Sequence, residues 1–170
     1  MKSLKTIVFS LIFGLTGVYT AQAQTEFEVP EDIQLEAKED YTLYESDIID
    51  AAKWLEETNL DKEINKRTNV NVFVLQWLTG SPTVDLEIGE ELIKLVENNT
   101  PLLGIYLASY AREVLENKEA STKFSATKAG LMAVMNVYKK GIQINKNKNL
   151  DKLIALTNKN KLDDYIKSKF

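Results

Sequence analysis

The chain has 170 residues, with 21 Lys plus Arg against 25 Asp plus Glu and a formal net charge of −4. It contains no His and no Cys, which excludes His-based catalytic triads, cysteine nucleophiles and His- or Cys-ligated metal centres. Its acidity argues against a nucleic-acid partner, and we expect neither a cofactor nor a metal site.

The N-terminus has the pattern of a secretory signal. Two lysines lie among the first five residues, a short apolar run covers 7–18, and Ala21-Gln22-Ala23 is a small-x-small cleavage sequence. The run is shorter than the ~20 residues of a membrane span. We therefore predict a signal peptide over 1–23, cleaved after Ala23, and no membrane span in the remaining 147 residues.

The expected location is therefore periplasmic or secreted. Abundant Lys, Asn and Ile, together with the AQAQ sequence at 21–24, resemble secreted proteins of Gram-negative bacteria with AT-rich genomes. This resemblance implies a bacterial envelope as the setting. Removal of Lys2 and Lys5 with the signal peptide makes the net charge −6.

Residues 24–42 are acidic, contain Pro30 and carry few large apolar side chains. We expect a partly disordered leader there. The alternating residues Phe27, Val29, Ile33 and Leu35 are the part of it that can form an extended strip on the domain. The all-α domain is predicted over 43–170.

The first helix is predicted from Tyr44 to Thr58. Its apolar face contains Leu43, Ile48, Ala51, Ala52 and Leu55, with Trp54 beside them. A second helix is expected over 61–78, although residues 69–72 alternate like a strand. We favour a helix whose apolar face is Ile64, Val72, Leu75 and Leu78. Gly80 and Pro82 mark its end.

After a helix over 89–97, the central helix begins at Thr100-Pro101, with Thr100 as the expected cap and Pro101 at the first helical position. It continues to Asn117 and contains a row of small residues at Gly104, Ala108, Ala111 and Leu115. The helix over 121–141 repeats that spacing at Ala126, Gly130, Ala133 and Val137. Because the connecting loop is short, we predict an antiparallel pair in which Gly104 lies near Val137 and Leu115 near Ala126.

Two short helices are expected at the end, over 150–157 and 162–169. The preceding segment 145–151 alternates oxygen-bearing side chains as a calcium loop would. Lysines interleave with them and no later Glu closes the loop, so we interpret these residues as helix caps.

Charge is unevenly distributed. Residues 26–63 contain 14 acids and three lysines, whereas residues 139–170 contain nine lysines and three aspartates. We interpret these segments as two solvated faces. The alternative is a basic C-terminal patch that binds an anionic envelope polymer.

These patterns predict a single all-α domain of about six antiparallel-paired helices after a cleaved signal peptide. Our leading hypothesis is a non-catalytic secreted or periplasmic protein that binds another macromolecule, such as an envelope protein. The alternative is a carrier of small apolar ligands, with a pocket between helices lined by Tyr106, Tyr110, Met132 and Met135. A carboxylate enzyme is the third hypothesis, for which two acids would have to face each other across a cleft.

Overall fold

The computed structural model describes residues 26–170, and the predicted signal peptide and its cleavage site lie outside them. Within this range the protein is all-helical, as predicted, with eight α-helices, one 3₁₀ helix and no strand. In chain order the helices are α1 (Lys38–Leu43), α2 (Glu45–Glu57), α3 (Ile64–Gly80), α4 (Glu90–Val96), α5 (Pro101–Asn117), η1 (Lys118–Ala120), α6 (Lys123–Lys140), α7 (Lys148–Thr157) and α8 (Leu162–Lys169).

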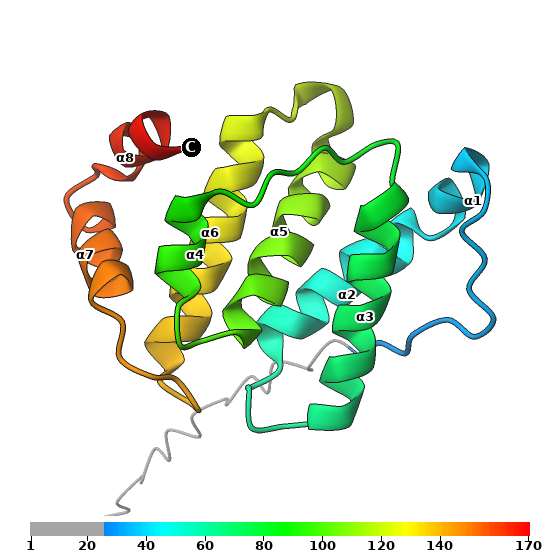
Figure 1. The fold of residues 1–170 in the computed structure, drawn as a ribbon, viewed down its shortest axis with the longest axis horizontal. Coiled ribbons are helices and arrows are strands. Elements are labelled where there is room, and N and C mark those ends of the chain that lie inside the picture. The colour runs from blue at the N-terminus through cyan, green and yellow to red at the C-terminus, as the bar shows by residue number, and fades with distance from the viewer. Residues whose placement is uncertain (1–25) are drawn as a thin grey trace, which may run out of the picture.

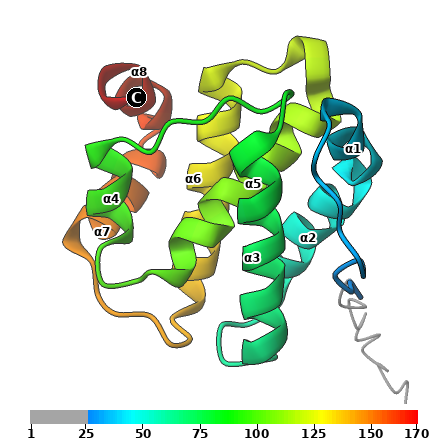
Figure 2. The ribbon, with the colours of Figure 1, turned by 45° about the vertical axis from the view of Figure 1, so that its right-hand side comes forward.

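Helix α5 occupies the centre of the fold (Figure 1). It packs most extensively against α6 and α2, and a smaller contact joins it to α3. Helices α7 and α8 lie along the outer side of α6, and α4 packs against α7. The same order is visible after rotation, with α3 in front of α5 (Figure 2).

The α5–α6 pair is antiparallel, as the short connection predicts (Figure 1). Pro101 is at the start of α5, but Thr100 makes no side-chain cap. The cap prediction is wrong because the Thr100 backbone is already helical, with φ −47° and ψ −37°. Thr122 does cap α6 by accepting a hydrogen bond from the Ser125 N–H at 3.1 Å.

Small residues let α5 and α6 approach each other closely, but only part of the predicted residue pairing is present. Gly130 of α6 lies against Tyr106 of α5. Gly104 instead faces Asn71 of α3, so its predicted pairing with Val137 is wrong. A row of small residues indicates where a neighbour can come close, but it does not say which neighbour.

Helix α2 buries its predicted face, except Leu43, which belongs to α1 and is 72% exposed. Residues 69–78 form part of α3, so the helix was the correct prediction. Its predicted face is wrong, because Ile64 is 58% exposed and Val72 and Leu75 are each 47% exposed. The buried face consists of Arg67, Val70, Phe73, Val74 and Trp77.

The segment before α2 lies against the helices. Phe27 is buried and its ring stacks on Phe73 with centroids 6.4 Å apart. Val29, Ile33 and Leu35 are partly buried against the core. These four alternating residues thus form a strip on the domain, as their pattern allowed, and α1 spans the expected boundary at residue 43.

Asparagine side chains join α4 to α7. Asn147 caps α7 by accepting from the N–H groups of Asn149 and Leu150 at 2.8 and 3.1 Å. Its amide nitrogen donates to the carbonyl of Leu95 at 3.1 Å, near the end of α4. The prediction that this segment supplies a helix cap is confirmed at Asn147.

Candidate functional site

A groove of about 400 Å³ lies between α3 and the first half of α5, two helices that contact each other (Figure 1). Its apolar lining comes from Leu60, Ile64, Leu75, Pro101, Leu103 and Leu107. The lining also includes the uncharged polar residues Thr68, Thr100 and Gln143. Apolar surface that stays open to water commonly marks a site for a partner or ligand. The groove is therefore the first candidate site.

Of the described residues that line the groove, Arg67 alone carries a charge. Its side chain is held by backbone carbonyls at the end of α2, because Nη1 donates to Leu55 O at 3.2 Å and Nη2 to Thr58 O at 2.6 Å. Its Nε has no hydrogen-bond partner, and the residue is only 6% exposed. Desolvation by burial lowers the pKa of Arg67, and the charge of Glu63 opposes that effect.

Asn71 lies one helical turn after Arg67 and also lines the groove. Its side-chain Oδ1 is buried without a hydrogen-bond partner. A Cβ atom at Gly104 would collide with this Oδ1, so glycine at that position makes room for the Asn71 amide. The groove thus contains one unpaired donor and one unpaired acceptor among apolar walls.

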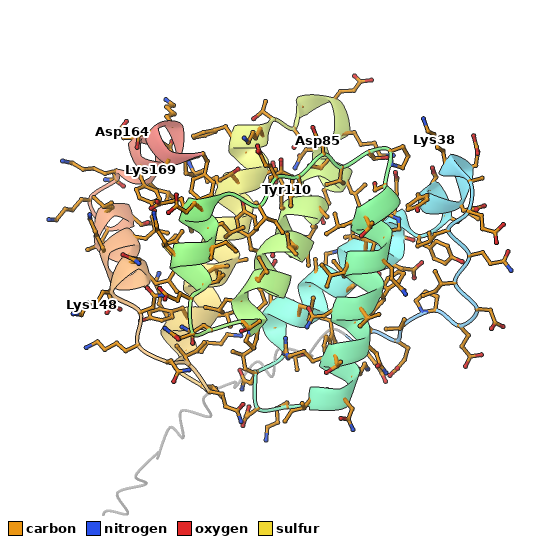
Figure 3. The ribbon with its side chains drawn as sticks, in the orientation of Figure 1. Lys38, Asp85, Tyr110, Lys148, Asp164 and Lys169 are labelled. Atoms are coloured by element: carbon orange, nitrogen blue, oxygen red, sulfur yellow. The ribbon has the colours of Figure 1, made fainter. Side chains whose placement is uncertain are left out.

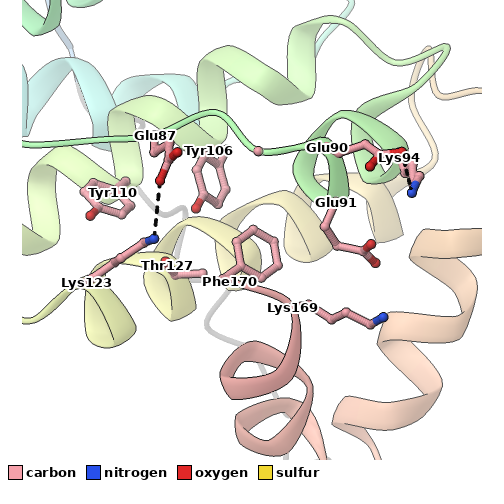
Figure 4. A pocket seen from close by; sticks show the side chains of 11 residues that line it. Glu87, Glu90, Glu91, Lys94, Tyr106, Tyr110, Lys123, Thr127, Lys169 and Phe170 are labelled. Carbon is pink, nitrogen blue, oxygen red and sulfur yellow. Dashed lines mark ion pairs between the residues drawn. The ribbon is translucent and has the colours of Figure 1, made fainter.

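A second concavity, of about 410 Å³, lies between the segment 87–94, the first turns of α6 and the end of the described chain (Figure 4). Tyr106 and Tyr110 of α5 contribute to its lining. Six charged residues surround it, namely Glu87, Glu90, Glu91, Lys94, Lys123 and Lys169. Two ion pairs, Lys123–Glu87 at 3.7 Å and Lys94–Glu90 at 2.9 Å, neutralise four of these charges. This polar cleft is suited to a polar ligand.

The phenols around the polar cleft are protonated at neutral pH. Desolvation by burial raises the pKa of Tyr106 to about 12, against a smaller opposing effect of its hydrogen bond with Thr127. Burial also raises the pKa of Tyr110, whose hydroxyl donates to Asp85 O at 3.1 Å. Tyr165 donates to the Glu91 carboxylate at 2.6 Å. The Tyr110 and Tyr165 hydroxyls therefore act as hydrogen-bond donors.

The four residues predicted to line a ligand pocket do not gather in one place. Tyr106 and Tyr110 meet in the polar cleft, with ring centroids 6.1 Å apart. Met135 is fully buried, and the Thr157 hydroxyl lies 3.5 Å from its sulfur. Met132 is 36% exposed and lines neither the groove nor the polar cleft. The structure therefore brings two of the four together, in surroundings more polar than we expected.

The carboxylates do not form a metal site within residues 26–170, where no three Asp or Glu side chains gather suitably. Asp47 and Asp50 share a face of α2, and burial, followed by the charge of Asp50, raises the pKa of Asp47. Asp50 pairs with Lys53 on the same helix at 3.4 Å.

The basic C-terminal segment forms an exposed edge. All nine lysines between 139 and 170 are exposed. Figure 3 places Lys148 near the start of α7 and Lys169 at the end of α8, on the side of the molecule formed by these two helices. This distribution fits a solvated face, and it would also be available to an anionic polymer.

Comparison with known proteins gives no relative: no family model matches the chain, and neither a curated protein nor a solved structure is significantly similar to it. Among the described helices, none combines the length and apolar character that a bilayer crossing requires. The apolar groove was missed by sequence reasoning. The signal that could have indicated it was the breadth of the apolar arc on α3, which is wider than one neighbour can cover.

Proposed function

We propose that this is a non-catalytic, exported binding protein that holds an apolar segment of another protein in the groove between α3 and α5. The observation that carries the proposal is the open apolar lining of the groove, in which Ile64 and Leu75 remain largely exposed to water. Burying such side chains against a partner contributes about 25 cal/mol per Å² of apolar surface. An envelope protein remains the expected partner, on the strength of the predicted signal peptide.

The groove supports a binder better than a carrier because most of its lining residues lie on α3 and α5 and the groove is open to solvent. A partner can therefore enter as a continuous chain. A carrier of small apolar molecules usually encloses most of its ligand. Proteins also commonly bind peptides in a groove between helices, where apolar side chains of the peptide serve as anchors.

Site-specific photo-crosslinking tests the proposal. A photoreactive amino acid replaces Leu75 in the groove, and the protein is irradiated in the cell envelope of its own source. We expect a discrete adduct with one envelope protein. The adduct should disappear when Ile64→Gln is added, because this substitution places a polar amide in the same apolar wall.

Val72 gives a matched control. It lies on the same helix as Leu75 and is equally exposed, at 47%, but it does not line the groove. The photoreactive residue at position 72 should give no discrete adduct. Equal adducts from both positions, or none from position 75, would refute the groove as the recognition surface.

A small-ligand carrier remains the second candidate, supported by the cleft in which Tyr106 and Tyr110 meet. The charged lining of this cleft favours a polar ligand over the apolar one first expected. Native mass spectrometry of the protein purified from its source tests this candidate. A retained small molecule that is lost in Tyr110→Ala would support it, and a ligand-free protein would count against it.

A further inference from the structure

The guanidinium of Arg67 lacks the partner that a buried charge normally has. It lies in an apolar groove, is 94% buried by surface area, and makes no ion pair with any described residue. Its Nη atoms donate to backbone carbonyls, and its Cζ lies 5.3 Å from the centroid of the Trp54 ring. These groups supply dipoles and an aromatic face, and Glu63 acts on the charge without forming an ion pair with it. Buried charges are costly unless they are paired and hydrogen-bonded. A carboxylate brought into the groove would supply the missing charge and an acceptor for Nε.

The Asn71 amide needs the opposite kind of partner, a hydrogen-bond donor. Its buried Oδ1 needs a hydrogen-bond donor, which a carboxylate cannot provide. Arg67 and Asn71 are four residues apart on α3, so their side chains lie on one face of the helix. An occupant that satisfies both must carry an acceptor with negative charge and an N–H group within about one helical turn.

We propose, on the basis of the proposed function, that the groove recognises an apolar peptide segment that contains one acidic residue, with its carboxylate paired to Arg67 and a nearby backbone N–H donating to Asn71. The apolar side chains on either side of the acid pack against Ile64, Leu75 and Leu103. Rotation of the Asn71 terminal torsion, which has a broad energy minimum, turns Oδ1 away from Gly104 and toward the occupant.

A fatty acid fits this pair of requirements less well than a peptide. Its single carboxylate could pair with Arg67, and its acyl chain could occupy the apolar walls. It has no donor for Asn71, whose oxygen would stay buried and unsatisfied. A peptide supplies N–H groups along its length and can meet both demands at once.

Selection from a random dodecamer peptide display library tests the inference. The library is selected on the purified protein and counter-selected on the Leu75→Gln variant, which alters an exposed groove side chain. Peptides that bind the protein but not the variant are groove-dependent. We expect their consensus to contain a single Asp or Glu between large apolar residues.

The consensus peptide is then synthesised in two forms, with the acid and with its amide counterpart. Calorimetry should show that the amide form binds about ten- to a hundredfold more weakly, the value expected for loss of a charged hydrogen bond. Groove-dependent peptides without an acid, or equal affinity of the two forms, would overturn the inference but leave the proposed function standing. Failure to recover any groove-dependent peptide would overturn both. Dodecanoate, titrated in parallel, should bind more weakly than the acidic peptide, and tighter binding would overturn the choice of a peptide.

Arg67→Gln provides the protein side of the test. The two peptide forms should bind this variant with the same affinity, because the charge that distinguishes them has been removed. Arg67 also holds the carbonyls at the end of α2, so the variant's thermal unfolding is measured first. If it does not fold, the comparison of the two peptides on the unaltered protein still decides the matter. A persistent preference of folded Arg67→Gln for the acid form would overturn the assignment to Arg67.

Discussion

Gly130 lies so close to Tyr106 that a Cβ atom on the glycine would be 2.7 Å from the tyrosine Cδ2 and 3.0 Å from its carbonyl oxygen. Real Cβ atoms avoid such distances, so only glycine fits where α6 crosses α5. The ring is buried and the carbonyl is part of the α5 backbone, so neither can move away easily.

Gly130→Ala should therefore destabilise the protein by about 1–3 kcal/mol, the usual cost of overpacking a core. This cost outweighs the gain of up to ~1 kcal/mol that alanine brings to a helix interior. Urea unfolding measures the difference. Gly104→Ala is the control, because its Cβ would meet the end of the Asn71 side chain, which can rotate. Equal losses in the two variants would contradict the close approach at Gly130.

The orientation of α3 shows what sequence patterns can and cannot determine. The 3.6-residue period of its apolar residues correctly predicts a helix. Apolar side chains cover most of its circumference, however, so two different arcs qualify as the buried face. The structure buries the arc with Phe73 and Trp77, because large aromatic rings remove more apolar surface from water. That criterion was available from the sequence and favours the observed arc.

The burial of Arg67 could not be predicted in the same way. Arginine is rarely buried, and nothing local to α3 explains its position. The reason is distant in sequence, because its guanidinium binds carbonyls at the end of α2. The presence of Arg67 in the lining of the groove therefore depends on its contact with the end of α2, and the periodicity of the sequence does not reveal that contact.

Asn147 links α4 and α7 through both ends of its amide. Its oxygen caps α7, while its nitrogen donates to carbonyls near the end of α4. Asn147→Ala should cost about 2 kcal/mol, at the upper end of the range for a lost cap, because the α4 carbonyls also lose their donor.

Asn147→Asp separates the two roles. Aspartate keeps the cap but places a negative charge against the carbonyls of α4, so it should also destabilise the protein, although it is an ideal cap elsewhere. Asn136→Asp, at an exposed position of α6, is the control and should have little effect. Thermal unfolding measures all three variants. Full stability of Asn147→Asp would show that the donation to α4 contributes nothing.

The buried phenol of Tyr106 makes stability depend on alkaline pH. Its pKa is about 12 in the folded protein, against an ordinary value of 10.0. Above the ordinary value the unfolded chain has released the proton and the folded protein has not, so the folded state loses its advantage as the pH rises. The contribution of Tyr106 to the free energy of unfolding is fully present below about pH 10. It declines toward pH 12, by on the order of 2–3 kcal/mol.

Urea unfolding at a series of pH values between about pH 9 and pH 12 measures this decline. Tyr106→Phe should show a shallower decline, since it removes one of the phenols. It should not abolish the decline, because burial also raises the pKa values of Tyr110, Tyr138 and Tyr165. An unchanged slope in Tyr106→Phe would show that its hydroxyl already ionises at an ordinary pKa.

Phe27 anchors the extended strip to α3 by stacking on Phe73. Because Phe27 is buried, Phe27→Ala should cost about 3 kcal/mol, the lower end of the range for Phe-to-Ala changes in cores, as a peripheral site can partly close. It should also increase amide hydrogen exchange over 28–37, where the strip would detach before the helices unfold. Glu31→Ala, at an exposed position of the same strip, should change neither quantity. If Phe27→Ala behaves like Glu31→Ala, the strip contributes nothing to the stability of the helices, and the folded unit begins near residue 43 as the sequence alone suggests.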